Sequence, residues 1–170
     1  TLLAIAPGAQ QSRTYYDAAQ IVLGPDDPAF ERLIDPNGDG IVDALGHWRD
    51  GDTGHTILGL YENDGSGNFS LVWSHSEVLL GSTWDDDVLA VGDLDGDGLQ
   101  DFALAYGSTI LPYTTNGLGA PTARPPIELQ EGYPIDDLAI GDIGGDGVPD
   151  IVAMTNIEVH VLPIDVAFPD

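Results

Sequence analysis

The chain has 170 residues, of which 29 are acidic, four are arginine, none is lysine and none is cysteine, for a formal charge of −25. This balance argues against binding to nucleic acid and against insertion into or adsorption on an anionic membrane. The absence of cysteine excludes a disulfide framework and thiolate metal sites. Because 42% of the residues are hydrophobic and occur in regular apolar runs, we expect a folded domain and not a disordered chain.

Short apolar runs bounded by Asp and Gly predict β-strands along most of the chain, so the expected fold class is all-β. A first set of strands is expected near residues 32–34, 43–48, 56–62 and 70–74. A second set is expected at 88–92, 102–106, 109–114 and 126–130. Residues 138–170 supply a further first strand, a loop and up to two more strands.

Prolines mark the weakest of these strands. Pro121, Pro125 and Pro126 flank the last extended segment of the second set. Because proline has no N–H to donate to a sheet ladder, this segment is restricted to an edge strand or a loop.

A nine-residue pattern occurs three times in the chain, each time between the first two strands of a set. The clearest copy, DLDGDGLQD at 93–101, places carboxylates at positions 1, 3, 5 and 9 and glycines at positions 4 and 6. The other copies read DPNGDGIVD at 35–43 and DIGGDGVPD at 142–150. Converging carboxylates repel one another unless a hard cation lies among them, and Ca²⁺ accepts about six to eight oxygen ligands. Three copies in register argue against a chance cluster of turn residues.

A helix-flanked calcium loop is a poorer interpretation of the same pattern. An EF-hand requires a glutamate at position 12, where the three copies have Gly46, Leu104 and Ala153. The flanking runs VLAVGD and DFALAY are typical of buried strands. Each loop is therefore expected to join two strands.

The loops and the segments around them resemble those of a known family. The loops GDLDGDGLQD and GDIGGDGVPD resemble the calcium loops of FG-GAP and VCBS repeats, as found in the propeller of integrin α subunits. The segment LYENDGSGNFS resembles the outer hairpin of VCBS repeats. LLAIAPGA resembles the Gly-Ala-Pro part of FG-GAP repeats, with Ile5 where the family usually has Gly. The resemblance covers most of the chain and implies propeller-type blades of four antiparallel strands, with calcium in the loop between the first two.

The resemblance also implies a set of calcium ligands, in which position 7 contributes its backbone carbonyl. By position these ligands are Asp35, Asn37, Asp39, Ile41 and Asp43; Asp93, Asp95, Asp97, Leu99 and Asp101; and Asp142, Asp146, Val148 and Asp150. Gly144 replaces the position-3 ligand of the third loop, so the 142–150 site is expected to be the weakest of about three.

The spacing of the loops predicts the organisation of the chain. Asp35 and Asp93 are 58 residues apart and Asp93 and Asp142 are 49 apart, periods that suit propellers and solenoids. We expect a partial blade at 1–30, whole blades at 31–86 and 87–137, and a partial blade at 138–170. The chain is then a piece of a larger propeller, a subunit completed by other copies of itself, or a compact four-bladed ring. The first two are favoured because unpaired end strands need a partner to cover them.

The predicted function is a calcium-binding structural or adhesion module that is extracellular or at the cell surface. Calcium is near millimolar outside cells, and loops of this kind often bind too weakly for a resting cytosol. The expected partners are other copies of the chain or the rest of a larger propeller, together with a protein or glycan ligand.

Two alternative functions are also compatible with the sequence. In a carbohydrate-binding propeller, Trp48, Trp73 and Trp84 would be stacking platforms, although packing between blades is the favoured interpretation. A calcium-dependent hydrolase or lyase is the least favoured, because the metal loops account for the carboxylate clusters. The histidines are scattered, with no nucleophile in a telling context beside them, so no catalytic residue is predicted. They are His47, His55, His75 and His160.

Overall fold

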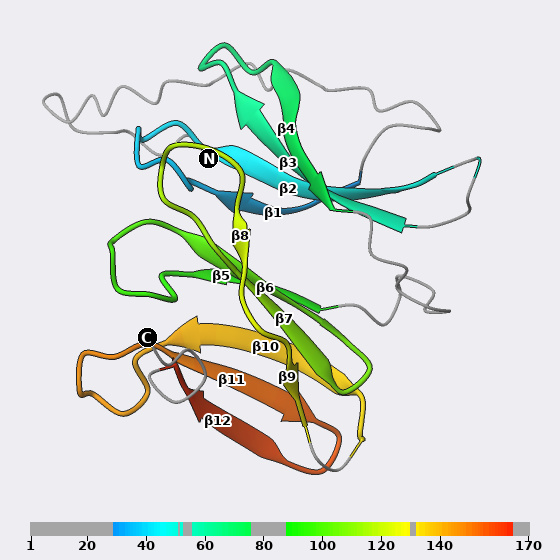
Figure 1. Ribbon diagram of the computed structural model, residues 1–170, viewed down its shortest axis with the longest axis vertical. Coiled ribbons are helices and arrows are strands. Elements are labelled where there is room, and N and C mark those ends of the chain that lie inside the picture. The colour runs from blue at the N-terminus through cyan, green and yellow to red at the C-terminus, as the bar shows by residue number, and fades with distance from the viewer. Residues whose placement is uncertain (1–28, 51, 53–55, 76–87, 130–131, 165–170) are drawn as a thin grey trace, which may run out of the picture.

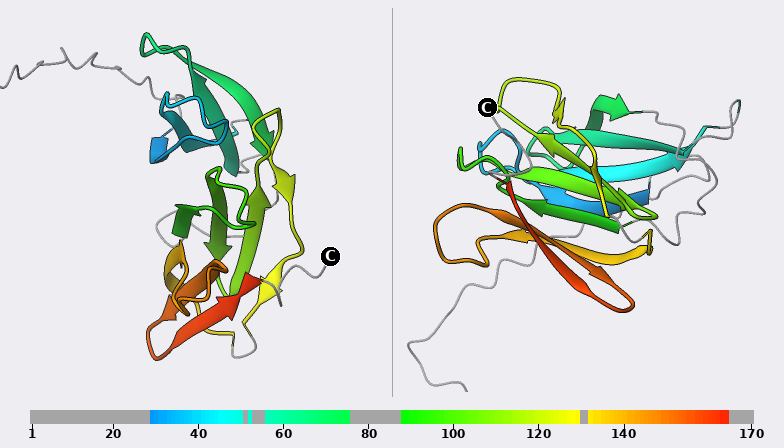
Figure 2. Two further views of the ribbon diagram at one scale, coloured as in Figure 1. Left: turned by 90° about the vertical axis from the view of Figure 1, so that its left-hand side faces the viewer. Right: turned by 60° about the horizontal axis from the view of Figure 1, so that its bottom comes forward.

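The structure is a computed structural model that describes residues 29–50, 52, 56–75, 88–129 and 132–164. Within these ranges the chain forms three antiparallel β-sheets that follow one another as a stack (Figures 1 and 2). The first sheet has the order β1-β2-β3-β4. Its strands are β1 (Ala29–Ile34), β2 (Asp43–Arg49), β3 (Thr56–Asn63) and β4 (Phe69–His75). The all-β prediction is confirmed, and each strand lies at or within a few residues of its predicted place.

The second sheet contains β5 (Val88–Gly92), β6 (Asp101–Tyr106) and β7 (Thr109–Thr114), with two short strands at the edge beyond β7. These are β8 (Thr122–Ala123) and β9 (Ile127–Glu128), both paired with β7. The prediction of one fourth strand over 126–130 was therefore wrong in its extent. Pro125 and Pro126 lie between the two short strands and cannot donate to the ladder, so the edge is split in two.

The third sheet consists of β10 (Ile135–Gly141), β11 (Asp150–Thr155) and β12 (Val159–Pro163), in that order. It supplies the first strand, the loop and the two further strands that the sequence predicts for this part of the chain. The described residues include neither a fourth strand of this sheet nor a closed ring of sheets. The blade boundaries remain a prediction, and nearly all of the partial blade at 1–30 lies outside the described residues.

The second sheet is covered on both faces, and its sequence reflects this. Every residue of β7 and all but the last residue of β6 are buried, which explains why both strands read as continuous apolar runs. One core lies between the first and second sheets and includes Leu45, Leu60 and Phe102. A second core lies between the second and third sheets and includes Ile110 and Ile151.

Of the three tryptophans, two lie in described strands and pack against other aromatic rings. The Trp73 ring lies 5.8 Å from the ring of Phe102 and 5.4 Å from that of Tyr113, so it packs between the first two sheets as predicted. Trp48 is half-buried, with its ring 6.3 Å from that of Tyr61. Trp84 lies outside the described residues, as does His55.

The first strands of the three sheets lie beside one another. Arg32 on β1 donates from Nε to the carbonyl of Leu89 on β5 at 3.0 Å. Gly92 on β5 approaches β10 so closely that a Cβ there would lie 2.7 Å from the Cβ of Ile140. This arrangement places the loop after each first strand on one common side of the stack.

Candidate metal centres

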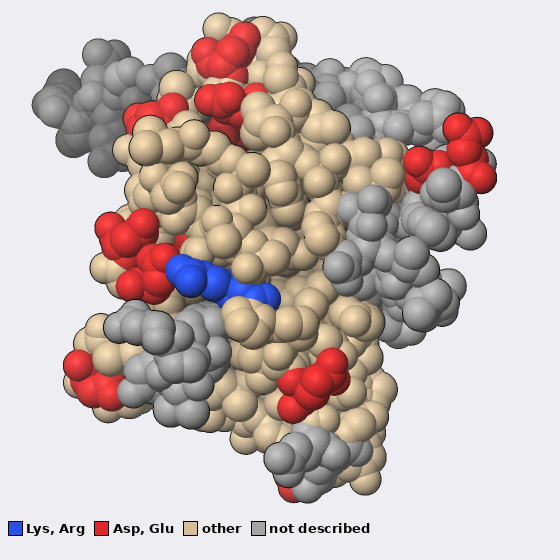
Figure 3. Space-filling view, in the orientation of Figure 1, with Lys and Arg blue, Asp and Glu red and all other residues tan. Residues whose placement is uncertain are grey.

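The three predicted calcium loops lie on the same side of the stack, between β1 and β2, β5 and β6, and β10 and β11 (Figure 1, left-hand side). Acidic side chains gather along this side in the space-filling view (Figure 3). The sequence-predicted ligands are thus brought to one edge of the molecule, each set at the mouth of its own sheet.

The position-1 aspartate organises each loop by accepting backbone hydrogen bonds. In the second loop Asp93 accepts from Gly96 N at 2.7 Å and from Gly98 N at 2.9 Å, one bond to each carboxylate oxygen. The first and third loops repeat both bonds, from Gly38 and Gly40 to Asp35 and from Gly145 and Gly147 to Asp142.

The glycines at positions 4 and 6 are required by the backbone conformation of the loops. In the second loop Gly96 has φ of 78° and Gly98 has φ of 88°, and the other two loops have positive φ at both positions. Residues with a Cβ rarely adopt this left-handed conformation. In the third loop the inward-pointing Gly147 amide is the main reason why the pKa of Asp142 is lowered, against the effect of desolvation.

Positions 3 and 5 close the turn. The position-5 aspartate accepts a bond from the amide of position 7 in every loop, at 2.7 Å for Asp39, 2.8 Å for Asp97 and 2.9 Å for Asp146. The position-3 side chain accepts from the amide of position 5 in the first two loops. In the third loop Gly144 has no side chain to do so, and the Asp146 amide donates to the position-1 carboxylate at 3.1 Å instead.

The position-9 aspartate of each loop is buried, although it is an ionisable group. The exposed fractions are 2% for Asp43, 0% for Asp101 and 6% for Asp150. Desolvation by burial raises the pKa of Asp101 to about 6, more than the amides of Thr115 and Leu94 lower it. Desolvation likewise raises the pKa of Asp43. A buried carboxylate is costly unless a cation or several donors compensate it, so these residues fit a metal-ligand role.

The second loop brings its carboxylates together at one point. Oxygen atoms of Asp93, Asp95 and Asp101 all lie within 4.8 Å of one another. Calcium binds oxygen at about 2.3–2.6 Å, so ligands on opposite sides of one ion are about 5 Å apart and the cluster fits a single Ca²⁺. Elsewhere in the described ranges no three acidic or histidine side chains converge as closely. The first loop has Asn37 at position 3 and the third has Gly144, so each offers one carboxylate fewer.

The structure adds contacts that the sequence did not reveal. Gln100 accepts the amide of Asp35 on its Oε1 at 2.7 Å, and the Thr115 hydroxyl donates to the carbonyl of Pro36 at 3.1 Å. These bonds tie the first two loops together across two sheets. Arg124 places Nη2 3.4 Å from Asp95 Oδ2. Arg124 is one of only four arginines in a chain without lysine, and this rarity is the one sequence signal that could have drawn attention to it.

His47, His75 and His160, the histidines that the structure describes, lie on strands away from the loops and do not form a metal site among the described residues. His47 Nδ1 is 3.3 Å from Glu31, and burial lowers the pKa of His47 in spite of that carboxylate. His160 is 3.7 Å from Glu158, and the His75 ring stacks on Trp73. They occupy ordinary strand positions, as the sequence predicts for His160; His55, for which the same is predicted, lies outside the described residues.

Comparison with known proteins places these loops in a family. No curated protein matches the chain. The described residues include no helix that is long and apolar enough to cross a membrane. A family model described as an FG-GAP-like repeat matches twice, over residues 35–104 and 93–153. Each match begins at position 1 of one loop and extends past the end of the next loop, and together they cover well over half of the chain. The chain therefore belongs to the FG-GAP-like repeat family.

Proposed function

We propose that this protein is a calcium-binding structural module in which each loop holds one Ca²⁺. The observation that carries the proposal is the convergence of Asp93, Asp95 and Asp101 on one point, with Asp101 fully buried. The first and third loops repeat the hydrogen bonds of the second loop around positions 1 and 5. The proposed ligands are those given by position above, with the third site weakest because Gly144 has no oxygen to offer.

Calcium would act on the fold and not in a reaction. An ion in each loop would compensate the buried position-9 carboxylate and fix the turn between the first two strands of a sheet. Three ions would reduce the formal charge from −25 to −19. At a free calcium concentration of a hundred times the dissociation constant, each site adds about 2.7 kcal/mol of stability. Three such sites are comparable with the whole net stability of a typical domain, about 5–15 kcal/mol.

The proposed location is extracellular or at the cell surface. FG-GAP repeats are typical of extracellular proteins, where calcium is plentiful enough to fill sites of modest affinity. The acidic surface that remains after calcium binding suits a structural or adhesive role among other proteins. Carbohydrate binding is the less favoured function, because the Trp73 ring packs between two sheets.

The module is proposed to continue its stack with further blades, either in a larger propeller or in another copy. The described part of the third sheet has three strands, and its outer face exposes Met154, Val159 and Val161 at 42%, 60% and 46%. The second sheet, which is covered on both faces, shows how such a surface is buried when a neighbouring sheet packs on it.

The test is thermal unfolding of the whole chain in calcium and after calcium removal with EGTA. We expect the melting temperature to rise with calcium concentration and to fall by many degrees in EGTA, with magnesium at the same concentration giving a much smaller rise. An unchanged melting temperature in excess EGTA would contradict the structural role of calcium. Light scattering after gel filtration in the same two buffers then reports whether assembly depends on calcium.

A further inference from the structure

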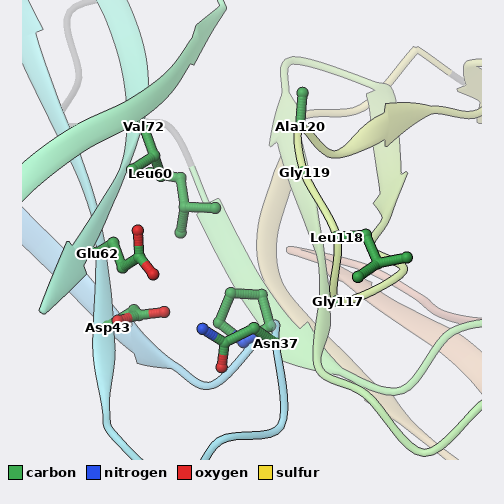
Figure 4. A pocket seen from close by; sticks show the side chains of 10 residues that line it. Asn37, Asp43, Leu60, Glu62, Val72, Gly117, Leu118, Gly119 and Ala120 are labelled. Atoms are coloured by element: carbon green, nitrogen blue, oxygen red, sulfur yellow. The ribbon is translucent and has the colours of Figure 1, made fainter.

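A pocket of about 430 Å³ lies between the first sheet and the connection from β7 to β8, beside the first loop (Figure 4). One side is polar, with Asp43 on β2, Glu62 on β3 and the Asn37 side chain from the first loop. The remainder is apolar, with Leu60, Val72 and Leu118 among its lining residues. Leu118 is 92% exposed and Val72 is 50% exposed, so the described part of the chain leaves them largely uncovered.

One carboxylate oxygen in this pocket lacks the donor that its counterparts have. In the second and third loops the position-9 aspartate accepts a bond from the amide of position 2. Position 2 of the first loop is Pro36, which has no N–H. Asp43, which is 2% exposed, accepts the amide of Asn63 on Oδ1 at 2.8 Å. No hydrogen bond from the described residues reaches its Oδ2, and Asp43 lines the pocket.

The second sheet contains residues that correspond to Glu62 and Asn37 of the pocket. The amides of Asn63 and Thr115 each donate to the position-9 aspartate of their own sheet. The residues just before them, Glu62 and Thr114, therefore correspond. By loop position, Asn37 of the first loop corresponds to Asp95 of the second.

The guanidinium of Arg124 spans this place in the second sheet. It donates from Nε to the Thr114 hydroxyl at 3.0 Å, and its Nη2 lies 3.4 Å from Asp95 Oδ2. In the first sheet, the corresponding residues Glu62 and Asn37 both line the open pocket. Among the described residues, a guanidinium thus lies over the second loop, and none lies at the corresponding place over the first loop.

The number of charges around the first and second loops supports the same correspondence. The first loop and Glu62 together carry four carboxylates. The second loop also carries four, but Arg124 compensates one of them. A single cationic side chain in the pocket would equalise the two sites, and a Ca²⁺ in each loop leaves this difference unchanged.

We propose that the pocket is a docking site for an arginine side chain of a partner protein. The planar guanidinium carries five N–H donors, enough to pair with Glu62 and to contact the outer edge of the first loop, as Arg124 contacts the proposed calcium ligand Asp95. Its aliphatic stem would pack on the apolar wall, as long basic side chains commonly do. This inference goes beyond the structural role of calcium, because it states the chemistry by which the module recognises a partner.

The test is a titration of the whole chain with arginine amide in saturating calcium, followed by amide NMR spectra. We expect saturable shifts at Asn37, Glu62 and Leu118, and none with citrulline amide, whose side chain has the same length but ends in an uncharged ureido group. Equal shifts with both probes, or no saturable shifts with arginine amide, overturn the proposal. The spectra report folding separately, so failure of the proposed calcium role would be visible as a spectrum that does not depend on calcium.

Two variants sharpen the test. Glu62→Gln should weaken arginine amide binding by about tenfold or more, because a charge-assisted bond is lost. Glu31→Gln, at an exposed carboxylate of the same sheet that contacts His47, should leave binding unchanged. Unchanged binding in Glu62→Gln contradicts the proposal.

Val72→Arg places a guanidinium in the pocket from within the chain. Val72 and Arg124 each lie two residues after the strand partner of Glu62 or Thr114, namely Ser70 or Thr122. The variant should fold and lose arginine amide binding, because its own side chain fills the site. Full binding in this folded variant would show that the probe binds elsewhere and would overturn the proposal.

Discussion

The carboxylate of Asp101 accepts the backbone N–H of Thr115 at 2.7 Å, which joins the start of β6 to the end of β7. The other oxygen accepts the Leu94 amide at 2.7 Å, so one buried side chain holds a loop and a hairpin together. Asp43 and Asn63 repeat the relationship in the first sheet. The position-9 aspartate is therefore part of the sheet as well as a proposed metal ligand.

Asp101→Asn tests both roles. The amide keeps the shape of the side chain but removes the charge, and its NH₂ faces one of two N–H donors, at a cost of about 1–3 kcal/mol for an unmade buried bond. We expect calcium affinity at the second loop to fall at least about tenfold, measured by calorimetric titration. Asp136→Asn, at an exposed acid on β10, is the control and should keep the affinity of the parent chain.

The pH dependence without calcium follows from the same residue. Burial raises the folded-state pKa of Asp101 from 3.8 to about 6, so the folded protein binds this proton more tightly than the unfolded chain. Its contribution to stability is full below about pH 4 and is lost as pH rises to about 6. Calcium-free protein should lose stability over this window in urea unfolding. Calcium affinity should instead rise over it, because a proton no longer competes for Asp101.

A contradicting result for this prediction is a calcium-free stability that rises with pH over the same window. The lowered pKa of Asp142 affects stability only at more acidic pH, below the usual value of 3.8 for an aspartate. It therefore does not obscure the effect of Asp101. The lowered pKa of His47 favours the folded state as pH rises toward 6.5, so the window is compared in His47→Gln protein, where this opposing contribution is absent.

Gly98→Ala tests the loop conformation. Gly98 has φ of 88°, and a Cβ there would meet no atom within 4 Å, so backbone strain is the main cost of the change. We expect a loss of about 1 kcal/mol or more in unfolding free energy. Gly119→Ala is the matched control, because Gly119 has equal space but no positive φ. Equal effects of the two substitutions would show that the left-handed conformation does not matter.

Gly144→Asp restores the missing position-3 carboxylate of the third loop. A Cβ at Gly144 would lie 3.7 Å or more from the Asp146 carboxylate, an ordinary contact, and Gly144 has no positive φ. We expect the third site to bind calcium about tenfold or more tightly, seen as a stronger phase in calorimetric titration. Gly144→Ala alters the backbone in the same way without adding a ligand. If it raised the affinity equally, the carboxylate would not be the cause.

Sequence alone determined the features that depend on residues close together in the chain. The three loops follow from the spacing of Asp and Gly over nine residues, and the bonds from Gly96 and Gly98 to Asp93 follow from that spacing. Most strands follow from short apolar runs. Pro125 and Pro126 restrict their segment to an edge strand or a loop, but the sequence predicts one strand there, where the structure has the two short strands β8 and β9.

Tertiary structure alone decided the contacts between sheets. Gln100 reaches Asp35, Thr115 reaches Pro36 and Arg124 reaches Asp95 only because neighbouring strands pair in a particular register and sheets stack in a particular order. The separations are 65, 79 and 29 residues, so no local pattern encodes them. The burial of Asp101, and with it the raised pKa, likewise requires the second sheet to be covered, because desolvation depends on what packs around a carboxylate and not on its neighbours in the chain.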